Sequence, residues 1–543
     1  MTDLAGDNRS MLRSSSVMAA GTITSRVTGL LKNTALLAAV GGGVFADTYS
    51  VANTLPTIVY VLLVGGAINA VFIPQLVRHM DADADQGTAY AQRLFSAVVL
   101  VLAVITVVAV AAAPWLVQLY SSGWSSRDLE VATAFARLML PQIFFYGVFA
   151  LVSQVLNTRG RFGSPMFAPV TNNIVVIASA LAFLAVAGTG TTTRTVTDTE
   201  ILLLGVGTTL GAVAQSLALW PSLRRCGVRL RLRTDLRGQG LGTAWSLARW
   251  AILLVLVNQL GTLVVIRLAT GVNVSGDADA GVAVYQMAFV LFMLPQSVIT
   301  VSLVTALLPR LSKYAAADQV DVVRERIGWT LRTSGSLMVP AAAAFIVLGV
   351  PIAVLLFRYG TLSLESARLL GLTLSGFAVG LPAFSAYYVL MRAFYALEDT
   401  RTPTFNAMVL NGVNVVLAVL AVAWVPAEWA IPALGLAYAL AYWVGLASLA
   451  QQLRHRLGGL DGYLVVRTHV RVVLASLLAA VCMVAGAAAA ELVVGRAVDF
   501  TTSLVIVLTG LGFGTIGYLV GVRLFSITEV SDVLRLVAGR RHG

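Results

Sequence analysis

The sequence predicts an all-α polytopic membrane protein with about 14 transmembrane helices, each near the length that a bilayer requires. The chain has 543 residues, of which 58% are hydrophobic and only 11% are charged, and its mean hydropathy is +0.86. A soluble domain carries about 25% charged residues, and only helices or closed barrels satisfy their backbone hydrogen bonds inside lipid. The expected spans have the approximate limits 16–40, 48–78, 90–119, 130–157, 166–188, 199–222, 245–269, 281–311, 329–356, 366–396, 404–424, 429–454, 468–490 and 501–525.

The net charge of +12 is distributed in a way that predicts topology rather than nucleic-acid binding. Arginine and lysine alternate from loop to loop, and most lie on the side of the N-terminus, densest in the stretch Arg224–Arg237. Loops on the other side carry Asp277, Asp279, Glu428 and Asp499. Under the positive-inside rule, both termini and the basic stretch are therefore cytoplasmic, and the basic stretch is placed to contact anionic lipids.

An internal repeat predicts that the chain arose by duplication. At a constant offset of 238, four residues match four others: Pro165, Phe167, Asn173 and Val175 correspond to Pro403, Phe405, Asn411 and Val413. At an offset of 235, Pro74–Arg78 matches Pro309–Lys313. Six spans in each half make the two halves parallel repeats, as in transporters that work by alternating access.

This repeat divides the chain into six expected parts. They are a cytoplasmic leader (1–15), an N-terminal lobe with spans 1–6 (16–222), a basic cytoplasmic interlobe loop (223–244), a C-terminal lobe with spans 7–12 (245–454), two added helices as spans 13–14 (455–525) and a basic cytoplasmic tail (526–543).

The first span carries two cations, Arg26 and Lys32. A charge near the centre of a membrane helix costs about 2.5–3.5 kcal/mol and usually faces a bundle interior or a water-filled cavity. At 100° per residue, Ser25, Gly29 and Asn33 fall with both cations on one arc of about 120°, and the remaining surface is apolar. The first span therefore predicts the wall of a membrane cavity that binds an anion.

The second span suggests a helix that bends beside this cavity. It contains Asn53, and Pro56, Gly65 and Gly66 mark a kink or a close helix approach, although ordinary packing explains the glycines equally well. Asp47 precedes this span and is expected at the outer mouth. We interpret Asp47, Gly29, Pro56, Gly65 and Gly66 as candidate gate residues.

Two further arginines in spans have alternative interpretations. Arg267 in span seven is a candidate cavity cation, and Arg137 in span four could also line the cavity. Long basic side chains near the ends of spans readily extend to the membrane surface, which is the favoured reading for both residues.

The sequence offers no set of residues for catalysis or metal binding. Cys226 and Cys482 lie in different segments, and the four histidines do not cluster. The expected spans hold almost no carboxylates, so neither a catalytic dyad nor a carboxylate-based ion relay is evident. We expect a transporter with no cofactor, driven by the membrane potential or by an ion gradient.

Several motifs resemble the lipid II flippases of the MurJ (MviN) family, within the MOP exporter superfamily. They are Ser25-Arg26-Val27-x-Gly29, Asp47, Pro56, Gly66-Ala67, Phe72-x-Pro74, Leu156-Asn157-Thr158, Arg161-Phe162-x-x-Pro165, Phe167-Ala168-Pro169, Leu294-Pro295 and Leu308-Pro309-x-Leu311-Ser312. The resemblance covers essentially the whole chain. It implies a multi-pass protein of the bacterial cytoplasmic membrane that moves the undecaprenyl-diphosphate-linked muropeptide lipid II to the outer leaflet, with the lipid tail in a groove beside spans 13 and 14.

The resemblance also implies roles for particular positions. Arg26 matches the family's first cavity arginine, Lys32 takes the place of the second, and Asp47 matches an aspartate of the outer gate. The chain departs from the family pattern at Tyr60 and Val290, where arginines are usual, and at Gly65, where an acidic residue is usual. Arg267 is a candidate substitute for a missing arginine.

Three alternatives stay open at this point. The chain could be another lipid-linked oligosaccharide flippase or a multidrug antiporter of the same superfamily, although an antiporter for cationic drugs would need cavity carboxylates. A membrane-embedded peptidoglycan polymerase would need catalytic carboxylates in an outer loop. A scaffold for cell-wall synthesis or division proteins is supported by no motif, although such proteins, like membrane lipids, are possible partners.

Overall fold

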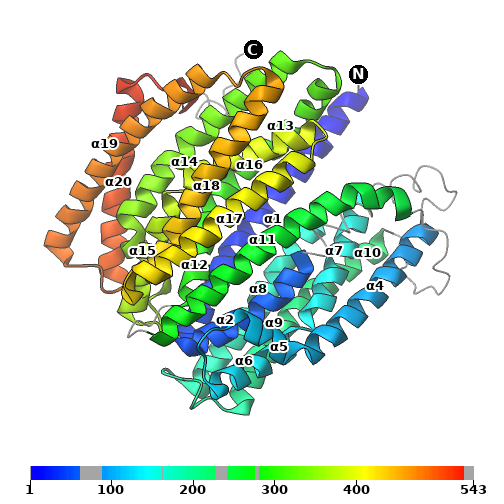
Figure 1. Cartoon of the computed structure of the whole chain (residues 1–543), viewed down its shortest axis with the longest axis vertical. Coiled ribbons are helices and arrows are strands. Elements are labelled where there is room, and N and C mark those ends of the chain that lie inside the picture. The colour runs from blue at the N-terminus through cyan, green and yellow to red at the C-terminus, as the bar shows by residue number, and fades with distance from the viewer. Residues whose placement is uncertain are drawn as a thin grey trace. The chain divides into compact units, whose positions relative to one another are not determined.

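The computed structural model describes residues 2–61, 88–159, 161, 163–226, 241–275 and 281–530. Over these residues all regular structure is helical (Figure 1). The chain forms two compact units: unit 1 comprises Met1–Gln259 with Tyr359–Thr361, and unit 2 comprises Leu260–Arg358 with Leu362–Gly543.

Unit 1 is built from the helices of the first half of the chain. They are α1 (Thr2–Val40), α2 (Val44–Val61), α4 (Thr88–Ala111), α5 (Ala113–Tyr120), α6 (Ser126–Met139), α7 (Gln142–Thr158), α8 (Gly163–Ala187), α9 (Asp198–Leu217), α10 (Trp220–Arg225) and the start of α11 (Leu241–Ser275).

Unit 2 contains the rest of α11 and the helices that follow it. They are α12 (Val282–Pro295), the π-helical turn η2 (Gln296–Thr300), α13 (Val301–Ala316), α14 (Val320–Phe357), α15 (Leu364–Ala378), α16 (Leu381–Ala396), α17 (Arg401–Trp424), α18 (Ala427–Leu457), α19 (Gly462–Val494) and α20 (Phe500–Leu524).

The predicted all-α membrane fold is confirmed. The described residues contain 10 helices long and apolar enough to cross a membrane, or up to 12 if two bent pairs each count as one span. The first bent pair is Phe95–Ala111 with Ala113–Tyr120 (70°), and the second is α15 with α16 (49°). These spans correspond to the third and later expected ones, and α1 and α2 contain the first and the start of the second. The expected number of 14 is compatible with this arrangement.

Some boundaries differ from the expected ones. α1 begins at Thr2, so the leader is helical, since no proline interrupts it before the first span. α11 begins at Leu241, inside the expected interlobe loop, of which 227–240 lie outside the described residues. The expected tail begins with Ile527 and Val530 buried against α19, so this part of it is packed. The division into lobes of six spans stays a prediction.

Leucine–proline pairs lie within or at the ends of helices at four places described here. Pro56 lies inside α2, Pro141 precedes α7, Pro295 ends α12 directly before η2, and Pro382 lies in the first turn of α16. Proline removes a backbone donor and clashes with the preceding turn, so a helix kinks or restarts there. Membrane helices tolerate this where neighbouring groups satisfy the freed backbone.

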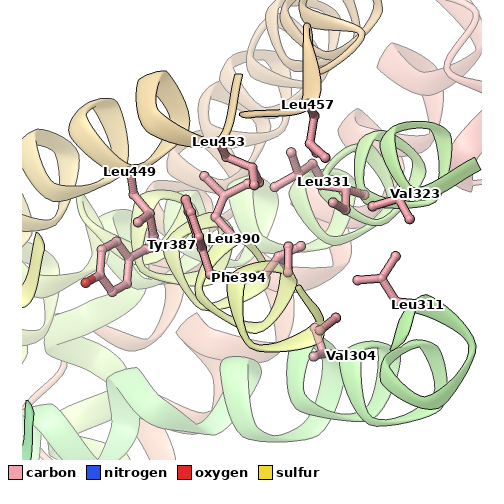
Figure 2. Close-up of a cluster of buried hydrophobic side chains, with 14 of the residues drawn as sticks. Val304, Leu311, Val323, Leu331, Tyr387, Leu390, Phe394, Leu449, Leu453 and Leu457 are labelled. Carbon is pink, nitrogen blue, oxygen red and sulfur yellow. The ribbon is translucent and has the colours of Figure 1, made fainter. Parts of the chain in front are cut away.

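Each unit has its own apolar core. In unit 1, Phe45 packs on Phe135 and Phe183, with ring centroids 5.9 and 6.0 Å apart. Figure 2 shows a core of unit 2, in which α13, α14, α16 and α18 contribute side chains such as Leu311, Leu331, Phe394 and Leu453. Burial at these positions fixes which face of each helix points inward.

The helices α19 and α20 run side by side (Figure 1) and meet at glycines. A Cβ on Gly514 would lie 2.2 Å from the Met483 side chain, and one on Gly521 would lie 2.8 Å from the Cα of Ala475. Small residues allow membrane helices to approach this closely. The role of these two helices in holding a lipid tail stays a prediction.

Candidate functional site

Arg26 and Lys32 both lie on α1 in unit 1. Arg26 is exposed and Lys32 is half-buried. Across the described part of the chain, neither side chain makes a hydrogen bond or an ion pair. An intramembrane charge is normally paired or lines a polar cavity, so two unpaired cations on one helix suit the binding of an anion.

Helix α8 covers one side of the polar arc. The side-chain amide of Asn173 donates to the Thr28 hydroxyl at 2.9 Å and to the Ser25 carbonyl at 3.2 Å. Gly29 lies in the same contact, since a Cβ there would be 3.6 Å from the Asn173 amide nitrogen. Ser25 and Gly29 therefore take part in helix packing, and their binding and gating roles stay predictions.

The other side of α1 is open. Arg26 is followed around this side by the exposed residues Ile23, Val27 and Leu31, and Asn33 is half-buried. The open face thus combines a cation with apolar surface. Such a surface matches a ligand that carries an anionic group next to hydrocarbon.

Asp47 is fully buried, with an exposed fraction of 0%. It lies in the first turn of α2, where the helix dipole stabilises a negative charge. Its neighbours Phe45 and Tyr49 belong to the aromatic core of unit 1, and the Tyr49 hydroxyl lies 2.8 Å from the hydroxyl of Thr208. Asp47 is thus a buried carboxylate at the start of α2, and its role at a gate stays a prediction.

The remaining candidates on α2 are Asn53, which is half-buried, and Pro56, which is buried inside the helix. The Asn53 carbonyl accepts a hydrogen bond from the Thr57 hydroxyl at 3.5 Å. Gly65 and Gly66 lie outside the described residues.

Arg267 lies on α11 in unit 2 and is exposed. The Arg267 carbonyl accepts a hydrogen bond from the Thr270 hydroxyl at 2.8 Å. Arg26 and Lys32 belong to unit 1, so a shared cavity with Arg267 stays a prediction.

In the sequence, Asn173 stands out only as a marker of the repeat, yet this residue holds the face that α1 turns toward α8. The matching Asn411 in unit 2 lies against Gly261 of α11, where a Cβ would be 2.2 Å from the Asn411 Oδ1. Each unit therefore places a repeat asparagine against a glycine of its first helix. The repeat itself was the signal that could have identified Asn173.

Buried amides join helices of unit 1. Asn172 donates to Gln215 at 2.8 Å and to the Tyr146 hydroxyl at 3.4 Å, which ties α8 to α9 and α7. Within the described ranges, no group of three or more His, Cys, Asp or Glu residues could hold a metal ion.

This fold, with unpaired cations in its first helix, is that of a polytopic helical transporter of the membrane. The family model "Lipid II flippase MurJ" matches residues 36–503. The chain belongs to this family, and it is a multi-pass protein of the inner membrane.

Individual relatives and solved structures agree with this assignment. A probable lipid II flippase MurJ of Rhizobium meliloti is 27% identical, over 75% of this chain and 75% of the relative. Lipid II flippase MurJ of Burkholderia cenocepacia is 28% identical, over 70% and 72%. The structure of a lipid II flippase MurJ in an inward closed conformation has a TM-score of 0.73 at 18% identity, over 95% of this chain and 99% of that one. An inward-facing multidrug resistance MATE transporter of the MOP superfamily has a TM-score of 0.64 at 14% identity, over 81% and 96%, and so shares the fold.

Proposed function

We propose that this protein flips lipid II from the cytoplasmic to the outer leaflet by alternating access. Membership of the MurJ family supports the substrate. The observation that carries the mechanism is the pair of unpaired cations, Arg26 and Lys32, on one membrane helix. In this proposal they neutralise the diphosphate of lipid II while the sugars contact Ser25, Asn33 and Asn53.

Charge is then the requirement at both positions. Arginine offers a planar fork that binds two phosphate oxygens, whereas lysine offers a compact point charge. Lys32→Arg should therefore preserve function, while Lys32→Gln and Arg26→Ala should abolish it. If the two cations only stabilised the bundle, Lys32→Gln would be tolerated, because removing an intramembrane charge lowers the cost of insertion.

Complementation of a strain depleted of its own flippase tests the proposal, with membrane abundance measured in parallel. Arg194→Gln is a matched control, since Arg194 is an exposed loop residue without a partner among the described residues. Full complementation by Arg26→Ala and Lys32→Gln at normal abundance would reject the cationic site. Depletion itself should trap lipid II in the inner leaflet, and accumulation in the outer leaflet would instead indicate a polymerase.

The similarity in fold to a multidrug transporter makes drug efflux the second candidate. A site for cationic drugs needs carboxylates, and the face of α1 carries cations instead. Drug resistance that depends on this protein, without accumulation of lipid II after depletion, would favour this second candidate.

The driving force belongs to the same proposal. An anion that moves outward gains about 2.3 kcal/mol per charge for each 100 mV of inside-negative potential. Collapsing the potential while keeping the sodium gradient should therefore stop flipping. Continued flipping under that condition would favour an ion gradient.

A further inference from the structure

A second charged site lies in unit 1, apart from the face of α1. A cavity of about 540 Å³ opens between α5, α6 and the start of α9. Its wall includes two cations and two carboxylates, which are Arg127, Arg137, Glu130 and Asp198. We call it the α6 pocket.

Two of these charges neutralise each other. The Arg127 Nη1 lies 3.3 Å from Glu130 Oε2, its Nε donates to the Thr193 carbonyl at 3.1 Å, and its Nη2 donates to the Val196 carbonyl at 3.5 Å. Arg127 therefore fastens the loop before α9 to α6 and forms a fixed wall of the pocket.

The other two charges have no such partner. Throughout the described residues, the side chains of Arg137 and Asp198 make no hydrogen bond or ion pair. Asp198 is not needed to cap α9, because Thr197 and Glu200 form the capping box there. The α6 pocket thus offers one free cation and one free anion.

The positions of Arg137 and Asp198 along the axes of α6 and α9 can be compared. The Thr209 hydroxyl donates to the Leu138 carbonyl at 2.7 Å, which aligns α9 with α6. Asp198 lies 11 residues before Thr209, so at 1.5 Å per residue it is about 16 Å further toward the start of both helices. Helical side chains tilt toward the N-terminus of their helix. The Arg137 guanidinium therefore extends along α6 toward the level of Asp198.

The depth of Arg137 matches a headgroup phosphate. One continuous span runs over Ser126–Asn157, and Arg137 lies 20 residues, or about 30 Å, from Asn157. This distance equals the thickness of the hydrocarbon core. With Asn157 at one boundary, Arg137 lies at the other.

Exposed apolar side chains lie beside the pocket and along α9. Trp115, next to the lining residue Pro114, is 62% exposed, and on the other side of the Arg137 level, further along α9 than Thr209, Leu210 and Leu217 are 51% and 61% exposed. Exposed tryptophan is typical of the membrane interface. A phospholipid can therefore place its headgroup in the pocket while its acyl chains lie along exposed apolar side chains.

We propose that the α6 pocket binds the zwitterionic headgroup of an ethanolamine phospholipid, with the phosphate on Arg137 and the ammonium on Asp198. The order of the two charges fits this headgroup. Arg137 lies nearer the membrane core than Asp198, and the phosphate of such a lipid lies nearer the acyl chains than the ammonium does. An anionic glycerol headgroup would satisfy Arg137 and leave Asp198 without a counter-charge. This inference goes beyond lipid II transport and does not depend on it.

Lipid binding to the purified full-length protein tests the proposal. Native mass spectrometry in detergent would compare phosphatidylethanolamine with phosphatidylglycerol of the same acyl chains, with inorganic phosphate as a competitor. We expect the wild type to bind the ethanolamine lipid about tenfold more tightly, which is the effect of one charge-assisted contact. Millimolar phosphate should not displace it.

The variants separate the two charges. Arg137→Gln should weaken binding of the ethanolamine lipid about tenfold, and Arg137→Lys should retain most of it. Asp198→Asn should remove the preference between the two lipids. Arg194→Gln and Glu325→Gln, at exposed residues without partners among those described, are the charge-matched controls and should bind as the wild type does.

Three results would overturn the proposal. They are equal binding of both lipids by the wild type, unchanged binding by Arg137→Gln and Asp198→Asn, and displacement of the lipid by phosphate alone, which would indicate a simple anion site. If Arg137→Gln does not fold, as judged by gel filtration, Arg137→Lys and Asp198→Asn still decide between these outcomes.

Discussion

Asn173 of α8 and Thr28 of α1 are joined by a hydrogen bond of 2.9 Å. The bond fixes the rotation of α1, because the same amide also holds the Ser25 carbonyl. Arg26 consequently stays on the open side of the helix. The asparagine of the repeat thus helps to determine which side chains of α1 are exposed.

The two repeat asparagines lead to opposite expectations for neighbouring glycines. Gly29→Ala should be neutral or stabilise by up to about 1 kcal/mol, since its Cβ would make an ordinary contact and alanine favours a helix. Gly261→Ala should destabilise by about 1–3 kcal/mol, because its Cβ would lie 2.2 Å from Asn411 Oδ1 and would disturb the bond from Asn411 to the Ala407 carbonyl. Thermal unfolding of the purified variants measures both, and equal effects would contradict the packing described.

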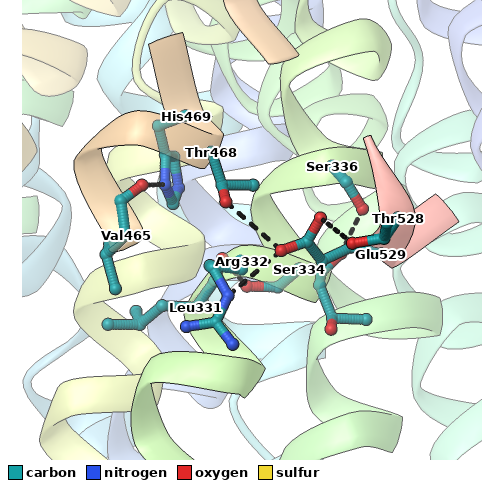
Figure 3. Close-up of polar contacts among 10 residues, drawn as sticks. Leu331, Arg332, Ser334, Ser336, Val465, Thr468, His469, Thr528 and Glu529 are labelled. Atoms are coloured by element: carbon teal, nitrogen blue, oxygen red, sulfur yellow. Dashed lines mark hydrogen bonds and ion pairs between the residues drawn. The ribbon is translucent and has the colours of Figure 1, made fainter. Parts of the chain in front are cut away.

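A buried ion pair in unit 2 should be a major determinant of stability. Arg332 of α14 donates to Glu529 at 3.1 Å, with side-chain exposures of 15% and 12%, and Thr468 of α19 donates to the same carboxylate oxygen (Figure 3). Glu529→Gln should destabilise by about 3–5 kcal/mol, because a buried guanidinium loses its counter-charge.

A matched control for this pair is Glu365→Gln. Its ion pair with Arg368 spans 3.9 Å and is exposed, so its loss should change stability by less than about 1 kcal/mol. Thermal unfolding and limited proteolysis of the segment after α20 would measure the difference. Similar effects for both variants would mean that the buried pair is replaceable.

The loop between α16 and α17 gives a pH dependence. Partial burial of Asp399 acts to raise its pKa, but the Thr402 N–H and hydroxyl and the Arg456 guanidinium outweigh it, so the pKa lies below its usual value of 3.8. A lowered pKa stabilises the folded state above pH 4, and this contribution disappears as the pH falls through the folded pKa. Asp399→Asn should therefore be less stable than the wild type at pH 7, with a difference that shrinks below pH 4.

Unfolding temperatures measured from pH 7 to pH 3 would test this dependence. Asp318→Asn is a suitable control, because Asp318 is an exposed carboxylate. A constant difference between wild type and Asp399→Asn across this range would contradict the assignment.

The orientation of the chain follows from its charges. Under the positive-inside rule, cysteines at Thr192 and Glu428 should react with an impermeant thiol reagent from outside, and a cysteine at His455 should react only after the membrane is opened. All three positions are exposed, and the half-buried Cys226 and Cys482 would first be replaced by serine. The reverse pattern of labelling would invert the proposed direction of transport.

The sequence was sufficient to predict the spans, because length and apolar composition are local properties. It did not predict that α5 turns away from α4 by 70°, although Pro114 in the first turn of α5 is the local cause. Its prediction that Asp47 lies at the outer mouth stays a prediction, and it gave no sign that this side chain is fully buried. Burial depends on which distant helices pack around a residue, and a local pattern does not contain that information.

The candidate site shows the same limit. Periodicity put Ser25, Gly29 and Lys32 on one arc with Arg26. It did not show that α8 covers one side of this arc while the other side is exposed. The hydrogen bond between Asn173 and Thr28, which are 145 residues apart, decides which side of α1 is covered by α8. Only the matching Asn173 and Asn411 of the repeat pointed toward that contact.

The final prediction concerns Gln142 and Gln296, which follow two of the helix-breaking prolines in Leu-Pro-Gln sequences. Both residues are 1% exposed, and both side-chain amides lack a hydrogen-bond partner among the described residues. An unsatisfied buried polar group costs about 1–3 kcal/mol. Methionine has a similar shape and no such requirement, so Gln142→Met and Gln296→Met should each raise stability by about that amount.

Gln215→Met is the matched control, because Gln215 is also buried but accepts a hydrogen bond from Asn172 at 2.8 Å. This variant should lower stability, since the buried Asn172 amide loses the shorter of its two hydrogen bonds and keeps only the one to Tyr146 at 3.4 Å. Thermal unfolding would rank the three variants, and complementation would show whether the stabilised ones still transport. If transport is lost while stability rises, the two amides find their partners in another state of the cycle. If all three variants are destabilised alike, the amides at the prolines are already satisfied in the resting protein, by water for example.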